Sequence, residues 1–258
     1  MIIYFSATGN SRYVAERIAK ATGDRTVSIT ACMKNQQFQF EFHESEFLGI
    51  VSPTYSWGLP EIVKEFLKKI NLNKKPSYIL FIATYGTTTG QIGNFANEIL
   101  QKQNIEISAY FSVKMPDTWT STFNLSNKEY VRKINERAEL QIDSVIDKII
   151  NRAIGDYMQR KVPMPIAKWF YNMEYDTMRK TSHFHVENTC VGCGLCAQKC
   201  PISAIDITNK QPVWNKEQCV MCLSCLHHCP KFAIQYGKRT KKHGQYVHFP
   251  LSVKENKV

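Results

Sequence analysis

The sequence of 258 residues contains no long hydrophobic run. A helix that spans a membrane needs about 20 mainly apolar residues in succession, and no segment here comes close to that length. Met1 is followed directly by a short apolar run, Ile2 to Phe5, without a basic region or a cleavage site. We therefore expect neither a membrane span nor a signal peptide, and we expect the protein in the cytoplasm.

Several signatures of catalysis and nucleotide binding are also missing. The absence of the pattern G-x-x-x-x-G-K disfavours a nucleoside triphosphatase. The dinucleotide fingerprint G-x-G-x-x-G does not occur either. No Ser-His-Asp or Cys-His set and no pair of catalytic carboxylates is evident, so the sequence predicts no catalytic residue.

Cysteine, in contrast, is abundant, with nine residues in the chain. Cys32 stands alone and is predicted to be a small buried hydrophobe. The other eight lie between Cys190 and Cys229, and an even number would also suit a disulfide scaffold. Their regular spacing and the missing signal peptide favour metal binding in a reducing compartment.

The formal net charge of +11 is unevenly distributed. Residues 1–120 hold 12 Lys and Arg against 10 Asp and Glu, whereas residues 121–258 hold 21 against 12. The tail from Lys238 has six basic residues and one acidic residue. Such a surface suits an acidic protein, an anionic membrane face or nucleic acid, or it serves solubility alone.

Strand and helix patterns alternate over the first 150 residues. Helices are predicted at Asn10–Ala21, from Pro60, around Ile92–Leu100, and from a capping box of Ser126 and Glu129 to Gly155. The five predicted strands are residues 1–5, 26–30, 47–52, 78–84 and 105–113. The alternation predicts an α/β fold with a doubly wound, five-stranded parallel sheet.

The composition changes after residue 155, which predicts a division into four parts. Residues 1–155 form the α/β domain. Residues 156–185 are rich in aromatics and contain proline, and we expect a linker that packs between domains rather than a free coil. Residues 186–237 form a cysteine module, and residues 238–258 form a basic tail.

The cysteine module contains the pattern C-x2-C-x2-C-x3-C-P twice, with an offset of 29 residues. The ligands of the first copy are Cys190, Cys193, Cys196 and Cys200, and those of the second are Cys219, Cys222, Cys225 and Cys229. Zinc sites also use C-x2-C pairs, but rarely with a third cysteine at the same step. His227 and His228 are expected to pack or face solvent, because eight thiolates already complete two sites.

This module resembles bacterial two-cluster ferredoxins, in which the fourth cysteine of each run ligates the other cluster. The resemblance implies a small α+β domain with two [4Fe-4S] clusters. It assigns Cys190, Cys193, Cys196 and Cys229 to one cluster, and Cys219, Cys222, Cys225 and Cys200 to the other.

The first predicted strand runs into a Ser/Thr/Gly loop that opens a helix, where a phosphate fits. The loop residues are Ser6, Thr8, Gly9, Asn10 and Ser11. They resemble the FMN phosphate loop of flavodoxins, Thr/Ser-x-Thr-Gly-x-Thr/Ser. The resemblance covers residues 1 to about 150 and implies further flavin contacts from the loops after the third and fourth strands. These are Pro53, Thr54, Tyr55, Ser56, Trp57 and Gly58, and Tyr85, Gly86 and Gly90.

Some roles in this half stay open. Tyr55, Trp57 and Tyr85 either contact the flavin or only pack a domain interface. Gly58 is the candidate for a peptide that flips toward reduced flavin, as in flavodoxins. The loop from Met115 to Trp119 reaches either the flavin or the cysteine module.

The whole chain resembles a fused flavodoxin and two-cluster ferredoxin. The resemblance implies electron transfer among FMN, two [4Fe-4S] clusters and external redox proteins, which the basic charge suggests are acidic. The alternative is a flavin-dependent NAD(P)H or quinone oxidoreductase. A redox-sensing nucleic-acid binder that uses the basic tail ranks well behind both.

Overall fold

The structure is a computed structural model and describes residues 1–43 and 46–248. A parallel sheet in the order β2-β1-β4-β6-β7-β8 forms the centre of the first half. Its strands are β1 (Ile2–Tyr4), β2 (Thr26–Ser28), β4 (Leu48–Pro53), β6 (Ile79–Tyr85), β7 (Ala109–Lys114) and β8 (Gly155–Asp156). A separate parallel pair joins β3 (Gln39–Phe40) and β5 (Asn71–Leu72).

The prediction of a doubly wound parallel sheet is confirmed, but its count of five strands is wrong. The sixth strand, β8, pairs Gly155 with Ala109 and Asp156 with Tyr110 at the sheet edge. Two residues are too few to show strand periodicity, so the sequence gives no sign of it.

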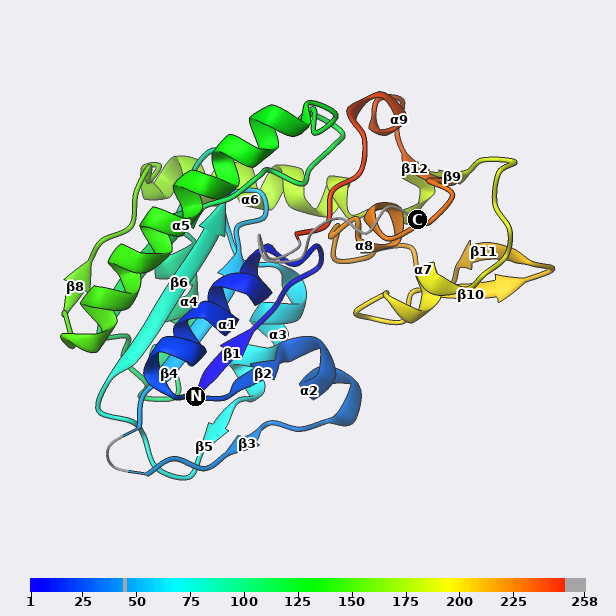
Figure 1. The fold of residues 1–258 in the computed structure, drawn as a ribbon. Helices are drawn as coiled ribbons and strands as arrows, with labels where there is room; N and C mark the ends of the chain where they lie inside the picture. Colours follow the sequence, from blue (N-terminus) through cyan, green and yellow to red (C-terminus); the bar gives the residue numbers. More distant parts are fainter. Residues whose placement is uncertain (44–45, 249–258) are drawn as a thin grey trace.

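Helices cover both faces of the sheet (Figure 1). One core layer packs α1 (Asn10–Thr22) and α5 (Lys128–Ile150) against the sheet. The other packs α2 (Ile29–Asn35), α3 (Glu61–Lys69) and α4 (Ile92–Gln101). Strand β6 lies between them with all its residues buried, as its unbroken apolar run predicts.

Three helical features differ from the prediction. The cap of helix α5 lies one residue later than predicted, because the side chain of Asn127 rather than that of Ser126 accepts the N–H of a first-turn residue, Tyr130. Helix α2 replaces the end of the second predicted strand and is capped by Ser28. Most of the predicted linker is α6 (Met164–Met178), a helix that begins after Pro163.

The cysteine module forms a small α+β unit that repeats itself. Helices α7 (Leu195–Gln198) and α8 (Ser224–His227) are separated by the same 29 residues as the two cysteine motifs. The remaining elements are η1 (Thr181–His183), β9 (Phe184–Val186), β10 (Ile205–Thr208), β11 (Gln211–Trp214), β12 (Ile234–Tyr236) and α9 (Thr240–His243). The pairs β9–β12 and β10–β11 are antiparallel.

The small unit lies against the edge of the large sheet at which the strands end (Figure 1). The Ser224 hydroxyl donates to the carbonyl oxygen of Ala7 at 3.2 Å, and His227 Nε2 bonds the carbonyl oxygen of Thr118 at 2.9 Å. Both partners follow strands of the sheet. None of the helices within the described residues has the length and apolarity required to cross a bilayer.

Candidate functional site

A cavity of about 260 Å³ opens at the carboxyl edge of the large sheet. The loops after β1, β4, β6 and β7 meet there, because parallel strands end at one edge. Eleven of the residues predicted for flavin binding line it, namely Ser6, Thr8, Asn10, Ser11, Pro53, Thr54, Tyr55, Ser56, Trp57, Tyr85 and Gly86. The other three predicted residues, Gly9, Gly58 and Gly90, lie outside the lining.

The loop after β1 is shaped for an anion. Gly9 has φ 100°, a left-handed conformation that lets the chain turn into α1, and its N–H donates to Ser6 Oγ at 3.2 Å. The first turn of α1 contains no acidic residue. Its free amide groups and the hydroxyls of Ser6 and Thr8 therefore suit a phosphate at the positive end of the helix.

Asn10 and Ser11 hold this loop in place through their side chains. Asn10 Nδ2 donates to the carbonyl oxygen of Pro116 at 3.1 Å, and its Oδ1 accepts the hydroxyl of Tyr246 at 3.0 Å. Ser11 Oγ and Thr84 Oγ1 are 2.8 Å apart. Since both ends of the Asn10 amide are already engaged, Asn10 supports the anion site and leaves the binding to its neighbours.

Aromatic rings form the wall that follows β4. Trp57 stacks on Phe170 of α6, with ring centroids 4.1 Å apart. Gly58 is held by two hydrogen bonds between its main chain and that of Tyr55, at 2.8 and 3.0 Å. Beside them, Thr54 Oγ1 is buried without a partner in the described structure. A planar, partly polar ligand fits such a wall, because it covers the rings and satisfies the hydroxyl.

The loop after β7 closes the cavity and contains a carboxyl group. Asp117 lines the cavity, and a Cβ atom at Gly86 would lie 2.2 Å from Asp117 Oδ2. The N–H of Trp119 donates to the other oxygen, Oδ1, at 3.1 Å. Burial raises the pKa of Asp117 to about 6, although the Trp119 hydrogen bond opposes the shift. Asp117 is thus poised to gain or lose a proton near neutral pH.

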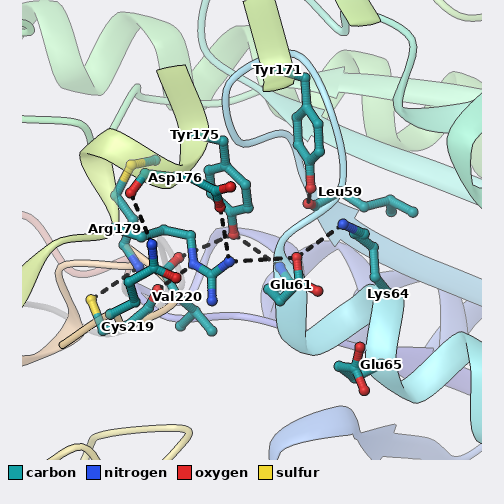
Figure 2. A network of polar contacts seen from close by, with 12 residues as sticks. Leu59, Glu61, Lys64, Glu65, Tyr171, Tyr175, Asp176, Arg179, Cys219 and Val220 are labelled. Carbon is teal, nitrogen blue, oxygen red and sulfur yellow. Dashed lines mark hydrogen bonds and ion pairs between the residues drawn. The ribbon is translucent and has the colours of Figure 1, made fainter. Parts of the chain in front are cut away.

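Helix α6 connects the large sheet to the cysteine module (Figure 2). The Tyr171 hydroxyl donates to the carbonyl oxygen of Leu59 at 2.6 Å, and Tyr175 Oη accepts the N–H of Glu61 at 2.9 Å. Arg179, just past the helix, donates from Nε to the carbonyl oxygen of Cys219 at 2.7 Å. One helix therefore fixes the start of α3 and the second cysteine motif relative to each other.

The eight motif cysteines form two groups, each around its own small cavity. Cys190, Cys193, Cys196 and Cys229 line one cavity, and Cys200, Cys219, Cys222 and Cys225 line the other. Each group thus takes three cysteines from one motif and the last cysteine of the other. No three His, Cys, Asp or Glu side chains in the described chain are arranged around a single metal ion.

Main-chain N–H groups point at sulfur in both groups. Ala204 N–H donates to Cys200 Sγ and Ala233 N–H donates to Cys229 Sγ, each at 3.2 Å and at equivalent places in the repeat. Burial raises the pKa of Cys219 to about 11 and that of Cys225 well above its ordinary value. Buried thiols of this kind become thiolates when a metal centre supplies positive charge, so the groups fit iron–sulfur clusters.

The cavity and the second cysteine group share part of their walls. Cys222 and Leu223 line both of them, and Met221 also lines the large cavity. Tyr55 is partly buried near Cys222, and loss of hydration around its hydroxyl, with a smaller contribution from that thiol, raises the pKa of Tyr55. Cys222 and Leu223 thus form a wall that the large cavity and the second cysteine group have in common.

The chain after α9 returns to the anion loop. The N–H of His248 donates to the carbonyl oxygen of Thr8 at 2.7 Å, and the His248 ring lies on Tyr13 with centroids 4.4 Å apart. A Cβ atom at Gly9 would lie 2.9 Å from the His248 carbonyl oxygen. Residues 244–248, which we call the C-terminal strap, thus cover the outside of the loop. Residues 249–258 of the predicted basic tail lie outside the described structure.

Some lining residues were not among the predicted contacts. The loop from Met115 to Trp119, whose target the sequence leaves open, contacts both the cavity and the cysteine module. Phe170 and Met178 enter the lining from α6. The aromatic content of the linker is the only sign of this in the sequence, since no motif assigns those residues to a strand end. His227 is 3% exposed and packs between the units, where its Nε2 bonds the carbonyl oxygen of Thr118.

The fold and its edge cavity define a flavoprotein of the doubly wound α/β class, joined to an iron–sulfur unit. Residues 1–144 match the family model of the flavodoxin domain, and residues 183–230 match that of the 4Fe-4S dicluster domain. Because the first match covers more than half of the chain, the protein belongs to the flavodoxin domain family. With its second domain it is a flavodoxin–ferredoxin fusion with a role in electron transfer.

Relatives with related sequences match short parts of this chain, each less than a third of its length. An uncharacterized protein of Methanocaldococcus jannaschii is 42% identical over 55 residues, which are 21% of this chain and 21% of that protein. A polyferredoxin-like protein of the same organism is 36% identical over 62 residues, 19% of this chain and 37% of that protein. The chain thus spans only 21% and 37% of these relatives. Among solved structures, a short-chain flavodoxin associated with a bacterial microcompartment has 13% identity, covers 55% of this chain and 95% of its own, and gives a TM-score of 0.34.

Proposed function

We propose that the cavity binds FMN, that each cysteine group holds one [4Fe-4S] cluster, and that the protein transfers electrons between these centres and external redox proteins. The flavodoxin and dicluster families support the kinds of cofactor. The division of eight cysteines into two groups of four supports the number of clusters. The anion-shaped loop beside an aromatic wall supports FMN.

The bound groups supply the redox chemistry: FMN takes up one or two electrons and a cluster takes up one, so the chain is suited to connect two-electron and one-electron partners. The protein supplies position and environment. Ser6, Thr8 and the start of α1 hold the phosphate, and Trp57 excludes water from the ring. The Asp117 carboxyl holds or releases a proton at the cavity wall.

One observation carries the proposal of internal electron transfer: Cys222 and Leu223 belong to the wall of the cavity and to the second cysteine group. Arg179 and Tyr175 donate hydrogen bonds to the carbonyl oxygens of Cys219 and Val220, which lie just before this shared wall in the chain. We assign residues 1–155 to flavin binding and 186–237 to cluster binding. Residues 156–185 join them, and the tail from 238 contains α9 and then the C-terminal strap.

The first test is isolation without oxygen, followed by assays of iron, acid-labile sulfide and flavin. We expect about eight irons per chain from two four-iron clusters and about one FMN from the single anion loop. Zinc without labile sulfide would contradict the clusters. If FMN stays bound after free flavin is removed, but photoreduction of this flavin never bleaches the cluster absorption, the proposal of internal electron transfer is wrong.

We also propose a location in the cytoplasm, because a reducing compartment keeps cysteines available as thiolate ligands of the clusters. The alternative of an NAD(P)H or quinone oxidoreductase makes a separate prediction: NADH bleaches the flavin at a steady rate without a protein partner. A carrier shows no such bleaching in a stopped-flow experiment with NADH.

A further inference from the structure

The two cysteine groups differ in their access to solvent. All four cysteines of the group next to the large cavity are buried. In the other group Cys193 is exposed, and Cys190 and Cys229 are partly buried. If the proposed clusters are present, an external one-electron partner approaches a redox centre most closely at Cys193.

The surface around Cys193 is apolar at its centre. Val191 is 58% exposed, and Ile207 of β10 is 37% exposed. Ile207 pairs with Pro212 across the hairpin, and both line the cavity of the Cys193 group. Exposed apolar side chains over a redox centre suit a small, transient contact with another protein.

Lysines without ion pairs border this centre. Lys210 lies against Gly192, where an added Cβ atom would come within 2.8 Å of Lys210 Cβ. Lys231 lines the cavity of the Cys193 group. Both lysines are exposed, and neither forms an ion pair with any residue that the structure describes. Their positive charge at this rim is therefore uncompensated by the protein.

The two acidic residues nearest in sequence do not cancel this charge. Glu187 pairs with Lys241 at 3.0 Å. Asp206 points to the opposite face of the hairpin from Ile207, because neighbouring strand residues alternate, and it accepts a hydrogen bond from Asn215 at 2.8 Å. The rim of Lys210 and Lys231 thus presents a positive surface beside the exposed cysteine.

We propose that this surface, made of Val191, Cys193, Ile207, Lys210 and Lys231 and called the Cys193 face, docks an acidic one-electron carrier protein. The proposal rests on the proposed function, because it needs a cluster behind Cys193. Opposite charges steer the partner to the face, and the apolar centre excludes water at the contact. An acidic protein fits better than nucleic acid, because the face offers apolar side chains and no aromatic ring for stacking on a base.

Stopped-flow oxidation of the reduced holoprotein by rubredoxin, a small acidic one-electron protein, tests this assignment. The charge-reversal variant K210E/K231E is compared with K75E/K102E, which changes two exposed lysines at the opposite, amino-terminal edge of the sheet. We expect the second-order rate constant at low salt to fall at least about tenfold in K210E/K231E and to change little in the control. The wild-type rate should fall as salt increases.

Equal rates in the two double variants, or a wild-type rate that rises with salt, would overturn the docking face. Polyglutamate, an acidic polypeptide, and a DNA oligonucleotide are added in turn as competitors of rubredoxin. Equal inhibition by the two would also overturn the preference for an acidic protein. An uncharged quinone serves as a second oxidant, and iron content checks that each variant is intact. If the quinone reoxidises the protein and the rate constant for rubredoxin is the same in K210E/K231E and in the wild type, only the docking proposal fails. If the clusters are never reduced and reoxidised by either oxidant, the proposed function itself fails.

Discussion

Arg179 Nε donates a 2.7 Å hydrogen bond to the main-chain carbonyl oxygen of Cys219, the first cysteine of the second motif. The same guanidinium lies 3.7 Å from Glu61 Oε2 at the start of α3. Arg179 is therefore one of the side chains that hold the cysteine module against the flavodoxin domain, together with Ser224 and His227.

Replacing Arg179 with glutamine should loosen this junction. The Cys219 carbonyl loses a charge-assisted hydrogen bond in a partly buried place, which typically costs about 1–3 kcal/mol. We expect a lower melting temperature for R179Q and faster bleaching of the cluster absorption in urea. The matched control is R137Q, since Arg137 is exposed on α5. Identical melting and bleaching of the two variants would show that this bond does not secure the second cysteine group.

Tyr246 gives a second prediction, because its hydroxyl donates to Asn10 Oδ1 in the anion loop at 3.0 Å. In Y246F that loop loses a support from the C-terminal strap. A lost hydrogen bond of about 0.5–1.5 kcal/mol corresponds to FMN binding that is about two- to thirteenfold weaker. Fluorescence titration of flavin-stripped protein measures this change. In the control Y130F, which alters a ring that is 53% exposed, FMN affinity should stay as in the wild type.

Motifs with a fixed spacing were predictable from the sequence, and contacts between distant segments were not. Ser6 to Ser11 and the eight cysteines are each confined to a short stretch, so local pattern alone marks them. Phe170 and Tyr246 reach the same site from α6 and from the C-terminal strap. Nothing in their local sequence encodes that meeting, because it depends on how the two domains pack.

Secondary structure was likewise predictable where a local pattern marks it and not where it depends on contacts with distant segments. The apolar run at Ile79–Tyr85 predicted a buried central strand, and it is one. Strand β8 has only two residues, and it exists because Gly155 and Asp156 lie beside β7, not because of any strand propensity. Helix α6 has buried residues at Ala167, Tyr171 and Tyr175, yet the prolines at its start and its many aromatic residues made the segment look like a linker.

The raised pKa of Asp117 predicts a pH-dependent stability. Between its ordinary value of 3.8 and about 6, this carboxyl binds more protons in the folded protein than in the unfolded chain. Folding stability therefore falls as pH rises through that window. D117N lacks the ionisable group, so its melting temperature should exceed that of the wild type by an amount that grows from pH 5 to pH 7 and is constant above pH 7. Both melting temperatures are measured on flavin-free protein with intact clusters. E106Q, at an exposed site, serves as the control, and a wild-type-to-D117N difference that does not vary with pH would contradict the shift.

The crossed grouping of the cysteines leads to the most direct prediction about ligation. Cys200 belongs to the first motif by sequence, but it lines the buried cavity together with Cys219, Cys222 and Cys225. C200A should therefore damage the buried cluster and C229A the exposed one, because each alanine removes one of four thiolates from its group. Iron assays should show about four irons retained in each variant if the clusters are independent, and electron paramagnetic resonance should show that the two variants retain different clusters. Cys32 is buried in the flavodoxin core, so C32A should keep all of the iron. If C200A and C229A instead retain the same cluster, the cysteines do not cross between the motifs.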